Sequence, residues 1–138
     1  MNCYPVITQY KMKHKSLTLS LVIPVFNEED HLDACLKAVV SQTVQPDEVI
    51  IVDNNSSDKS LEIAERYKFV KILQESKQGV LFARNRGFDF AKGEIIGRID
   101  ADTILSPRWI ESVKKVFLDA DIAAVTGPVN YYDMTLLL

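Results

Sequence analysis

Two aspartates separated by a single residue, Asp100 and Asp102, directly follow an apolar segment at residues 95–99. Carboxylate oxygens are preferred ligands of hard divalent cations such as Mg²⁺ and Mn²⁺. At this spacing two carboxylates can share one ion or its bound water molecules, and the ion would neutralise a bound diphosphate. Aspartates are also common in loops and helix caps for structural reasons alone. We therefore treat Asp102 and Asp100 as candidate metal ligands.

A third aspartate, Asp53, ends a second apolar segment at residues 49–52, and a polar run follows at residues 54–58. Several carboxylates would then meet in one crevice of a protein whose formal net charge is only -3. An unpaired buried carboxylate is costly, and a bound cation is the usual way to offset that cost. The neighbourhood of Asp53 therefore favours a metal site over a purely structural role.

The turn at residues 24–29 argues against a dinucleotide cofactor. It lacks the G-x-G-x-x-G pattern that lets a pyrophosphate approach the backbone. We therefore expect neither a nicotinamide nor a flavin dinucleotide. Glu28 and Glu29 would also repel a phosphate at the start of the following helix, so cations elsewhere must hold any phosphate group.

Apolar segments and helix signals alternate along the chain. The expected strands are residues 19–26, 49–52, 70–73, 95–99 and 122–126. The first expected helix runs from a cap at Asn27 to Ser41, and the second begins at a cap formed by Ser57 and Asp58. The third runs from Val80 to Lys92 and stops at a left-handed Gly93, and the fourth runs from Ser106 to Phe117. This alternation predicts an α/β fold: a doubly wound, mostly parallel, Rossmann-like sheet whose strand order begins 3-2-1-4. Phe26, Asp53 and Asp100 would then converge at the carboxyl ends of the strands, where the chain reverses direction.

Composition points to one soluble domain. The chain has 138 residues, 47% hydrophobic and 25% charged, and indicates neither disorder nor a nucleic-acid-binding surface. We interpret residues 1–16, which contain the main basic cluster, as a flexible N-terminal leader. Cys3 and Cys35 have neither disulfide nor metal-ligand spacing, which favours a cytoplasmic location, with the inner face of the membrane as an alternative. No apolar run in the sequence approaches the roughly 20 residues needed to cross a bilayer.

Four segments, in order along the chain, carry a resemblance to a known family. They are residues 22–29, 52–58, 83–87 and 100–102. These segments look like the successive signatures of family 2 glycosyltransferases with the GT-A fold, including the D-x-D motif of that family. The resemblance covers residues 17–129, which we take as the nucleotide-sugar-binding portion of a GT-A domain.

The resemblance implies an enzyme that transfers a sugar from a nucleoside diphosphate donor, commonly a UDP-sugar, to an acceptor hydroxyl with inversion at the anomeric carbon. It implies a divalent metal cofactor, either Mg²⁺ or Mn²⁺, and a role in the synthesis of cell-envelope polysaccharides. The acceptor stays open between a glycan, a lipid-linked glycan and a protein.

The resemblance also implies roles for residues that would touch the nucleotide. Pro24 and Phe26 resemble residues that line the base and ribose pocket, and Asp53 resembles the carboxylate that accepts a hydrogen bond from uracil. Glu28 belongs to the same nucleotide-sugar-binding set, although it would equally serve as a helix-capping residue. The structural alternatives are that Phe26 is a core residue and that Asp53 only caps the following loop.

Further positions would hold the diphosphate and its metal ion. Asp102 resembles the direct metal ligand of the D-x-D motif, with Asp100 assisting through the ribose or a water molecule. Lys77 and Arg84 occupy positions where family members place cations that contact the diphosphate. The alternatives are that Lys77 is a solvated loop residue and that Arg84 pairs with a neighbouring carboxylate.

The general base of the family lies far beyond the D-x-D motif, so we expect the catalytic base beyond Leu138. Residues 130–138 would begin a truncated acceptor-side region, which makes the expected fold incomplete at its C-terminus and the isolated chain inactive. The apolar end at residues 136–138 is expected to promote self-association.

Two other functions remain open. A donor-binding fragment without turnover would need the same nucleotide site but no base. A haloacid-dehalogenase-like phosphatase would use Asp100 as its nucleophile. That motif belongs on an early strand, with a lysine and an acidic pair well downstream. The late position of Asp100 in the chain therefore argues against a phosphatase.

Overall fold

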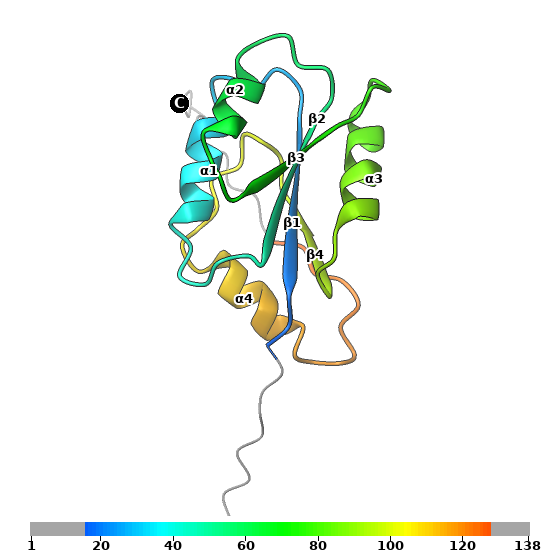
Figure 1. Cartoon of the computed structure of the whole chain (residues 1–138). Coiled ribbons are helices and arrows are strands. Elements are labelled where there is room, and N and C mark those ends of the chain that lie inside the picture. Colours follow the sequence, from blue (N-terminus) through cyan, green and yellow to red (C-terminus); the bar gives the residue numbers. More distant parts are fainter. Residues whose placement is uncertain (1–15, 128–138) are drawn as a thin grey trace, which may run out of the picture.

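The computed structural model describes residues 16–127, which form one sheet and the helices that cover it (Figure 1). In chain order the elements are β1 (Leu19–Val25), α1 (Leu32–Val40), β2 (Glu48–Asp53), α2 (Ser60–Glu65), β3 (Val70–Gln74), α3 (Val80–Phe90), β4 (Ile95–Arg98) and α4 (Trp109–Val116). The sheet has the order β3-β2-β1-β4, and all neighbouring strands are parallel. The predicted α/β fold and the predicted strand order are therefore confirmed.

The strand β1 lies between β2 and β4, and every one of its residues is buried. A strand covered on both faces needs apolar side chains on both, which is why its sequence reads as a continuous apolar run. Figure 1 shows α1, α2 and α4 on one face of the sheet and α3 on the other. The sheet is thus doubly wound, with a hydrophobic core on each face.

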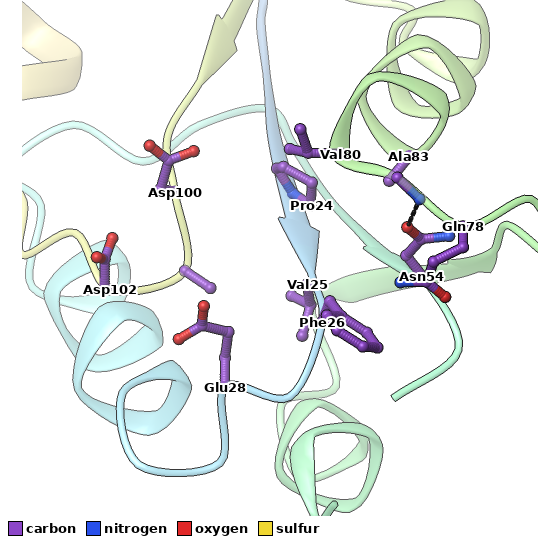
Figure 2. Close-up of a pocket in the computed structure, with 12 residues that line it drawn as sticks. Pro24, Val25, Phe26, Glu28, Asn54, Gln78, Val80, Ala83, Asp100 and Asp102 are labelled. Atoms are coloured by element: carbon purple, nitrogen blue, oxygen red, sulfur yellow. Dashed lines mark hydrogen bonds between the residues drawn. The ribbon is translucent and has the colours of Figure 1, made fainter. Parts of the chain in front are cut away.

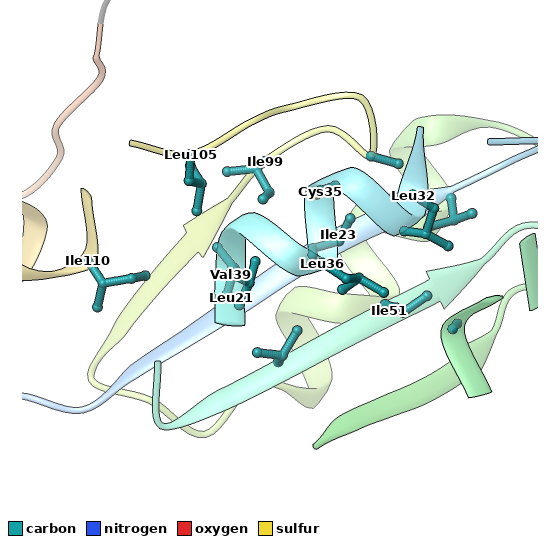
Figure 3. Close-up of a cluster of buried hydrophobic side chains, with 14 of the residues drawn as sticks. Leu21, Ile23, Leu32, Cys35, Leu36, Val39, Ile51, Ile99, Leu105 and Ile110 are labelled. Carbon is teal, nitrogen blue, oxygen red and sulfur yellow. The ribbon is translucent and has the colours of Figure 1, made fainter. Parts of the chain in front are cut away.

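The larger core lies between the sheet and the helices α1, α2 and α4 (Figure 3). The helix α1 buries four side chains that recur every three or four residues, as expected for one helix face. These residues are Leu32, Cys35, Leu36 and Val39. They pack against strand residues that include Leu21, Ile23 and Ile51. This core fixes α1, and hence the loop that precedes it, against the carboxyl ends of the strands.

The smaller core joins α3 to the opposite face of the sheet. Its buried residues are Val22, Ile50, Val52 and Ala83. At Gly87 a Cβ atom would lie 2.3 Å from Cγ1 of Val22, a separation too short for two carbon atoms. The absence of a side chain at Gly87 therefore allows α3 to approach the sheet closely.

The predicted helix start at Asn27 is wrong, because α1 begins only at Leu32. Asn27 adopts a left-handed conformation with φ 54°, which is incompatible with a helix N-cap. Its side-chain oxygen instead accepts a hydrogen bond of 2.8 Å from the backbone N–H of Ser57. Asn27 therefore ties the loop after β1 to the loop after β2.

Gly93 was predicted to stop a helix in the left-handed conformation, but α3 already ends at Phe90, and the only described glycine with positive φ is Gly79. Gly93 serves a close approach: a Cβ atom there would lie 2.5 Å from the backbone nitrogen of Ser20. The predicted strand at residues 122–126 is also wrong, since this segment forms no strand. Most of its residues are exposed, so it lacks the covered faces of a buried strand.

The predicted leader at residues 1–16 lies outside the described residues except for Ser16, and the segment 130–138 lies outside them entirely. Within residues 16–127, no helix has the length and hydrophobicity needed to span a bilayer.

Candidate functional site

A cavity of about 400 Å³ opens at the carboxyl ends of β1, β2 and β4 (Figure 2). It is lined by Pro24, Val25, Phe26, Glu28, Asn54, Gln78, Gly79, Val80, Ala83, Asp100, Ala101 and Asp102. These residues come from four separate chain segments. Parallel pairing brings the segments together, since it places the carboxyl ends of all strands at one edge of the sheet.

One side of the cavity carries carboxylates. Figure 2 shows Glu28, Asp100 and Asp102 on the same side, away from Phe26 and Gln78. Asp100 and Asp102 are placed by β4, whose pairing with β1 continues through a hydrogen bond of 3.2 Å from the Ile99 N–H to the carbonyl oxygen of Val22. Glu28 is placed by the loop after β1, where its backbone N–H donates to Oγ of Ser60 at 2.8 Å.

The expectation that buried, unpaired carboxylates line the crevice is wrong for two of the aspartates. The Asp100 side chain is 59% exposed and forms an ion pair with Arg98. Asp53 is buried, and its carboxylate accepts a hydrogen bond of 3.3 Å from the backbone N–H of Ser56. Desolvation therefore does not by itself call for a cation. What favours a metal ion at this site is the position of the carboxylates on one side of the cavity.

The carboxylate side fits a hard divalent cation that is shared with a ligand. Within residues 16–127, no group of three acidic, histidine or cysteine residues is close enough to hold a metal ion alone. Mg²⁺ in phosphate-binding proteins is commonly held by one or two carboxylates together with the phosphates of the substrate. Asp100 and Asp102 both lie at the cavity wall, where they would supply that number of protein ligands.

The opposite side of the cavity is apolar and amide-rich. Pro24, Phe26, Val80, Asn54 and Gln78 lie there (Figure 2). Phe26 is 49% exposed, so the alternative that it is a core residue is wrong. An exposed aromatic ring at a cavity wall offers a flat face on which a planar base can stack.

A buried asparagine connects this side of the cavity to the loop before α3. Asn54 is 2% exposed, and its Nδ2 donates to the carbonyl oxygens of Glu75 and Lys77, each at 2.8 Å. Its Oδ1 accepts a hydrogen bond of 2.7 Å from the Gly79 N–H (dashed line in Figure 2). The polar atoms of this side chain are therefore satisfied by the segment 75–79.

Five of the predicted site residues line the cavity, and three do not. The lining residues are Pro24, Phe26, Glu28, Asp100 and Asp102. The other three are Asp53, Lys77 and Arg84.

Each of the three residues outside the lining has other surroundings. The Nζ of Lys77 lies 3.8 Å from the centre of the Phe82 ring, and Asp53 caps its own loop, as its structural alternative proposed. Arg84 forms no ion pair with a described carboxylate, and its Nε is buried without a hydrogen-bond partner.

The sequence interpretation did not predict the other seven lining residues, which are Val25, Asn54, Gln78, Gly79, Val80, Ala83 and Ala101. One signal for them was available, since Gly79 directly precedes the predicted helix at residues 80–92 and follows a polar loop. A glycine there permits the observed φ of 134°. The other six positions have residue types that are ordinary in strands, loops and helices, although Val25, Asn54, Ala83 and Ala101 fall within the segments that carry the family resemblance.

Cys35 lies beneath the acidic side of the cavity. Burial, and then the charges of Asp102 and Glu28, raise the pKa of its thiol to about 12. Such a raised pKa keeps the thiol protonated at neutral pH, the form in which a cysteine is a weak nucleophile.

Comparison with known proteins places these features in a family. The model of glycosyl transferase family 2 matches residues 20–137. Glycosyltransferase GlyG of Streptococcus pneumoniae is 36% identical over 120 residues, which cover 83% of the chain and 39% of GlyG. The structure of S. aureus TarS 1–349 in complex with UDP superposes with a TM-score of 0.68 at 26% identity, covering 75% of the chain and 32% of that TarS fragment.

A third comparison concerns the fold alone. The mannosyltransferase PcManGT of Pyrobaculum calidifontis, solved in complex with GDP-Man and Mn²⁺, superposes with a TM-score of 0.65 at 23% identity. The match covers 73% of the chain and 31% of PcManGT. The chain therefore spans well under half of the length of these proteins.

Proposed function

The chain belongs to glycosyl transferase family 2 and has the GT-A fold, and from this premise we propose that its cavity binds a nucleoside diphosphate sugar together with a divalent cation. The observation that carries the proposal is the two-sided cavity. Carboxylates occupy one side, and an exposed aromatic ring with amide groups occupies the other. A nucleoside diphosphate sugar has two parts that match these two sides. Its planar base can stack on the aromatic ring, and its diphosphate needs a cation, which the carboxylates would hold.

We propose a UDP-sugar as the donor. The support is the likeness to TarS, which was solved in complex with UDP. Phe26 would stack on the base, Pro24 would contact the ribose, and Asp53 would accept the imide hydrogen of uracil. Asp53 is buried and does not line the cavity, so this contact requires its carboxylate to turn toward the cavity.

We propose that Asp102 binds the cation directly and that Asp100 and Glu28 contribute through water or the ribose. A bound Mg²⁺ or Mn²⁺ would supply electrostatic stabilisation of the departing diphosphate. Lys77 and Arg84 would reach the diphosphate only by moving from the positions described above. The buried Nε of Arg84 lacks a partner, which favours such a movement because an unsatisfied buried donor is costly.

Sugar transfer also requires an acceptor site and a base that removes a proton from the acceptor hydroxyl. We assign neither among residues 16–127. We propose that the described domain performs the donor half of an inverting transfer: it binds the nucleotide, orients the sugar and stabilises the leaving group. Binding of donor without transfer is the second candidate function, and the two-sided cavity supports it equally.

Calorimetric titration of the 138-residue chain with UDP and with GDP, each with and without Mn²⁺, tests the proposal. We expect UDP to bind appreciably better with Mn²⁺, because Asp100 and Asp102 otherwise repel the diphosphate, and to bind more tightly than GDP. Equal affinity with and without Mn²⁺ would remove the metal from the proposal. Absence of binding by both nucleotides would overturn the proposal itself.

A further inference from the structure

The loop between β3 and α3, residues 75–79, supplies Gln78 and Gly79 to the cavity wall. Backbone hydrogen bonds hold its two ends, since the Glu75 N–H donates to the carbonyl oxygen of Asp53 at 2.9 Å and the Gly79 carbonyl oxygen accepts from the Phe82 N–H at 3.0 Å. Between these ends Ser76, Lys77 and Gln78 are exposed. Apolar burial therefore contributes little to its conformation. Hydrogen bonds from polar side chains hold the middle of this loop against the end of the sheet.

Asn54 contacts the loop at three points. Its Nδ2 donates to the carbonyl oxygens of Glu75 and Lys77, both at 2.8 Å, and its Oδ1 accepts from the Gly79 N–H at 2.7 Å. Both amide hydrogens and the amide oxygen are thus used, in a side chain that is nearly inaccessible to solvent. Such a set of bonds specifies one arrangement of the three backbone groups.

Asn55 contacts the remaining two loop residues. Its Nδ2 donates to the carbonyl oxygen of Ser76 at 2.9 Å and to Oε1 of Gln78 at 3.2 Å. Asn55 has φ 65°, a left-handed conformation that asparagine tolerates better than most residues. The two asparagines together therefore contact all five residues of the loop. The contact to Gln78 leaves the Nε2 hydrogens of that side chain available to the cavity.

We propose that Asn54, assisted by Asn55, is a positioning residue: it holds the loop 75–79 in the arrangement that lets Gln78 and Gly79 contact the bound nucleotide. The inference rests on the proposed nucleotide-binding function of the cavity. Asn54 sits at the end of a rigid central strand, where β2 continues into Asn54 through a hydrogen bond of 2.9 Å from the Asn54 N–H to the Val25 carbonyl oxygen. The strand β2 therefore sets the position of the loop 75–79, which apolar burial alone would hold only weakly.

The test compares Asn54→Leu with a matched control, Gln42→Leu. Gln42 is also buried and also forms three side-chain hydrogen bonds, donating to the carbonyl oxygens of Ala38 and Ser106 and accepting from the Ile110 N–H. It does not line the cavity. Both substitutions remove one buried amide of similar connectivity, so both should lower the melting temperature.

Only the loss of Asn54 should change nucleotide binding. If the binding-competent loop arrangement falls to about a tenth of the population, the Kd for UDP with Mn²⁺ rises roughly tenfold. We expect that rise for Asn54→Leu and a change of less than about twofold for Gln42→Leu. An unchanged Kd for Asn54→Leu, or an equal rise for Gln42→Leu, would overturn the inference.

A second variant and a second measurement keep the inference testable if Asn54→Leu does not fold. Asn55→Gly preserves the left-handed backbone and removes only the side-chain bonds, so it should raise the Kd for UDP by a smaller factor, about threefold. Hydrogen exchange of the amides at residues 76–79 should quicken in both asparagine variants but not in Gln42→Leu. If the wild-type chain binds no nucleotide, the proposed function fails, and quickened exchange shows only that the asparagines hold the loop. Unchanged exchange overturns the inference in either case.

Discussion

Arg98 and Asp100 form an ion pair at the carboxyl end of β4. They lie two residues apart, and Asp100 is also one of the two carboxylates proposed to hold the cation. The positive charge of the guanidinium group would therefore compete with a metal ion for the carboxylate of Asp100. Both side chains are partly exposed, so the pair can rearrange at low cost when a ligand arrives.

Replacing this arginine should strengthen metal binding. In Arg98→Gln the competing positive charge is removed, and the Mn²⁺ concentration that half-saturates UDP binding should fall by about twofold to fivefold, the range for exposed charge pairs. Arg108→Gln is the control, since Arg108 pairs with Glu111 at the start of α4 and does not line the cavity. Titration of Mn²⁺ in the presence of UDP measures the effect. A higher Mn²⁺ requirement would mean that Arg98 contacts the diphosphate instead.

Asp102 and Asp53 should affect binding in different ways. Asp102→Ala should remove most of the dependence of UDP binding on Mn²⁺, because it deletes the proposed direct ligand. Asp53→Ala should weaken binding of uridine itself, which carries no phosphate and needs no metal. Calorimetry with UDP and with uridine separates the two effects, and thermal melting is the control. Loss of folding in both variants would support structural capping roles for these aspartates.

Glu48 should make the protein sensitive to acid. Burial alone would raise the pKa of Glu48, but hydrogen bonds from Lys71, Ser20 and the Lys92 N–H outweigh it and lower the pKa to about 2. A carboxyl group with a lowered folded pKa adds stability above its unfolded pKa, near 4.5, and loses that contribution as the pH falls toward 2. Denaturant unfolding of Glu48→Gln should therefore show a flatter decline in stability between pH 4.5 and 2.

At neutral pH the same variant should lose about 1.5 kcal/mol, the lower end for hydrogen bonds to charged groups. Asp119→Asn provides a comparison, because it changes an exposed carboxylate whose Oδ1 accepts a hydrogen bond of 3.1 Å from the backbone N–H of Asp121. A parallel decline with pH in Glu48→Gln and the wild type would contradict the assignment.

Gly87 should not tolerate a side chain. In Gly87→Ala the new Cβ would come within 2.3 Å of Val22 Cγ1 and 3.1 Å of Val52 Cγ2, so α3 must move away from the sheet. Overpacking of this kind costs about 1–3 kcal/mol, measurable by urea unfolding. Gly127→Ala is the matched control, since no described atom lies within 4 Å of the Cβ position there. Equal unfolding midpoints for the two variants would show that α3 accommodates the methyl group.

The strand order and the aspartates at the strand ends were predictable from the sequence for a physical reason. Buried parallel strands require apolar side chains on both faces, so segments such as 19–25 and 49–52 stand out as continuous runs. Once the order 3-2-1-4 is inferred, the ends of β1, β2 and β4 must converge, and this brings Phe26 and Asp100 to one cavity.

The detailed roles of polar loop residues were not predictable. The sequence predicts a helix cap at Asn27 and no role for Asn54, although both are asparagines that follow a strand. What distinguishes them is the location of their partners. Asn27 binds Ser57, 30 residues away, and Asn54 binds Gly79, 25 residues away. Such contacts depend on tertiary structure, so no local sequence pattern predicts them. The same holds for Gly93, whose glycine is required by the distant Ser20.

The two cores hold the two sides of the cavity unequally. The helix α1 buries four residues, whereas α3 buries only Ala83 and Gly87. Separating α3 from the sheet would therefore expose fewer fully buried residues than separating α1, and local opening is expected at the weaker attachment. The wall formed by Val80 and Ala83 belongs to α3, while Asp100 and Asp102 follow a strand of the sheet. The cavity can thus widen from the α3 side, giving a bulky ligand a way in while the carboxylates stay in place.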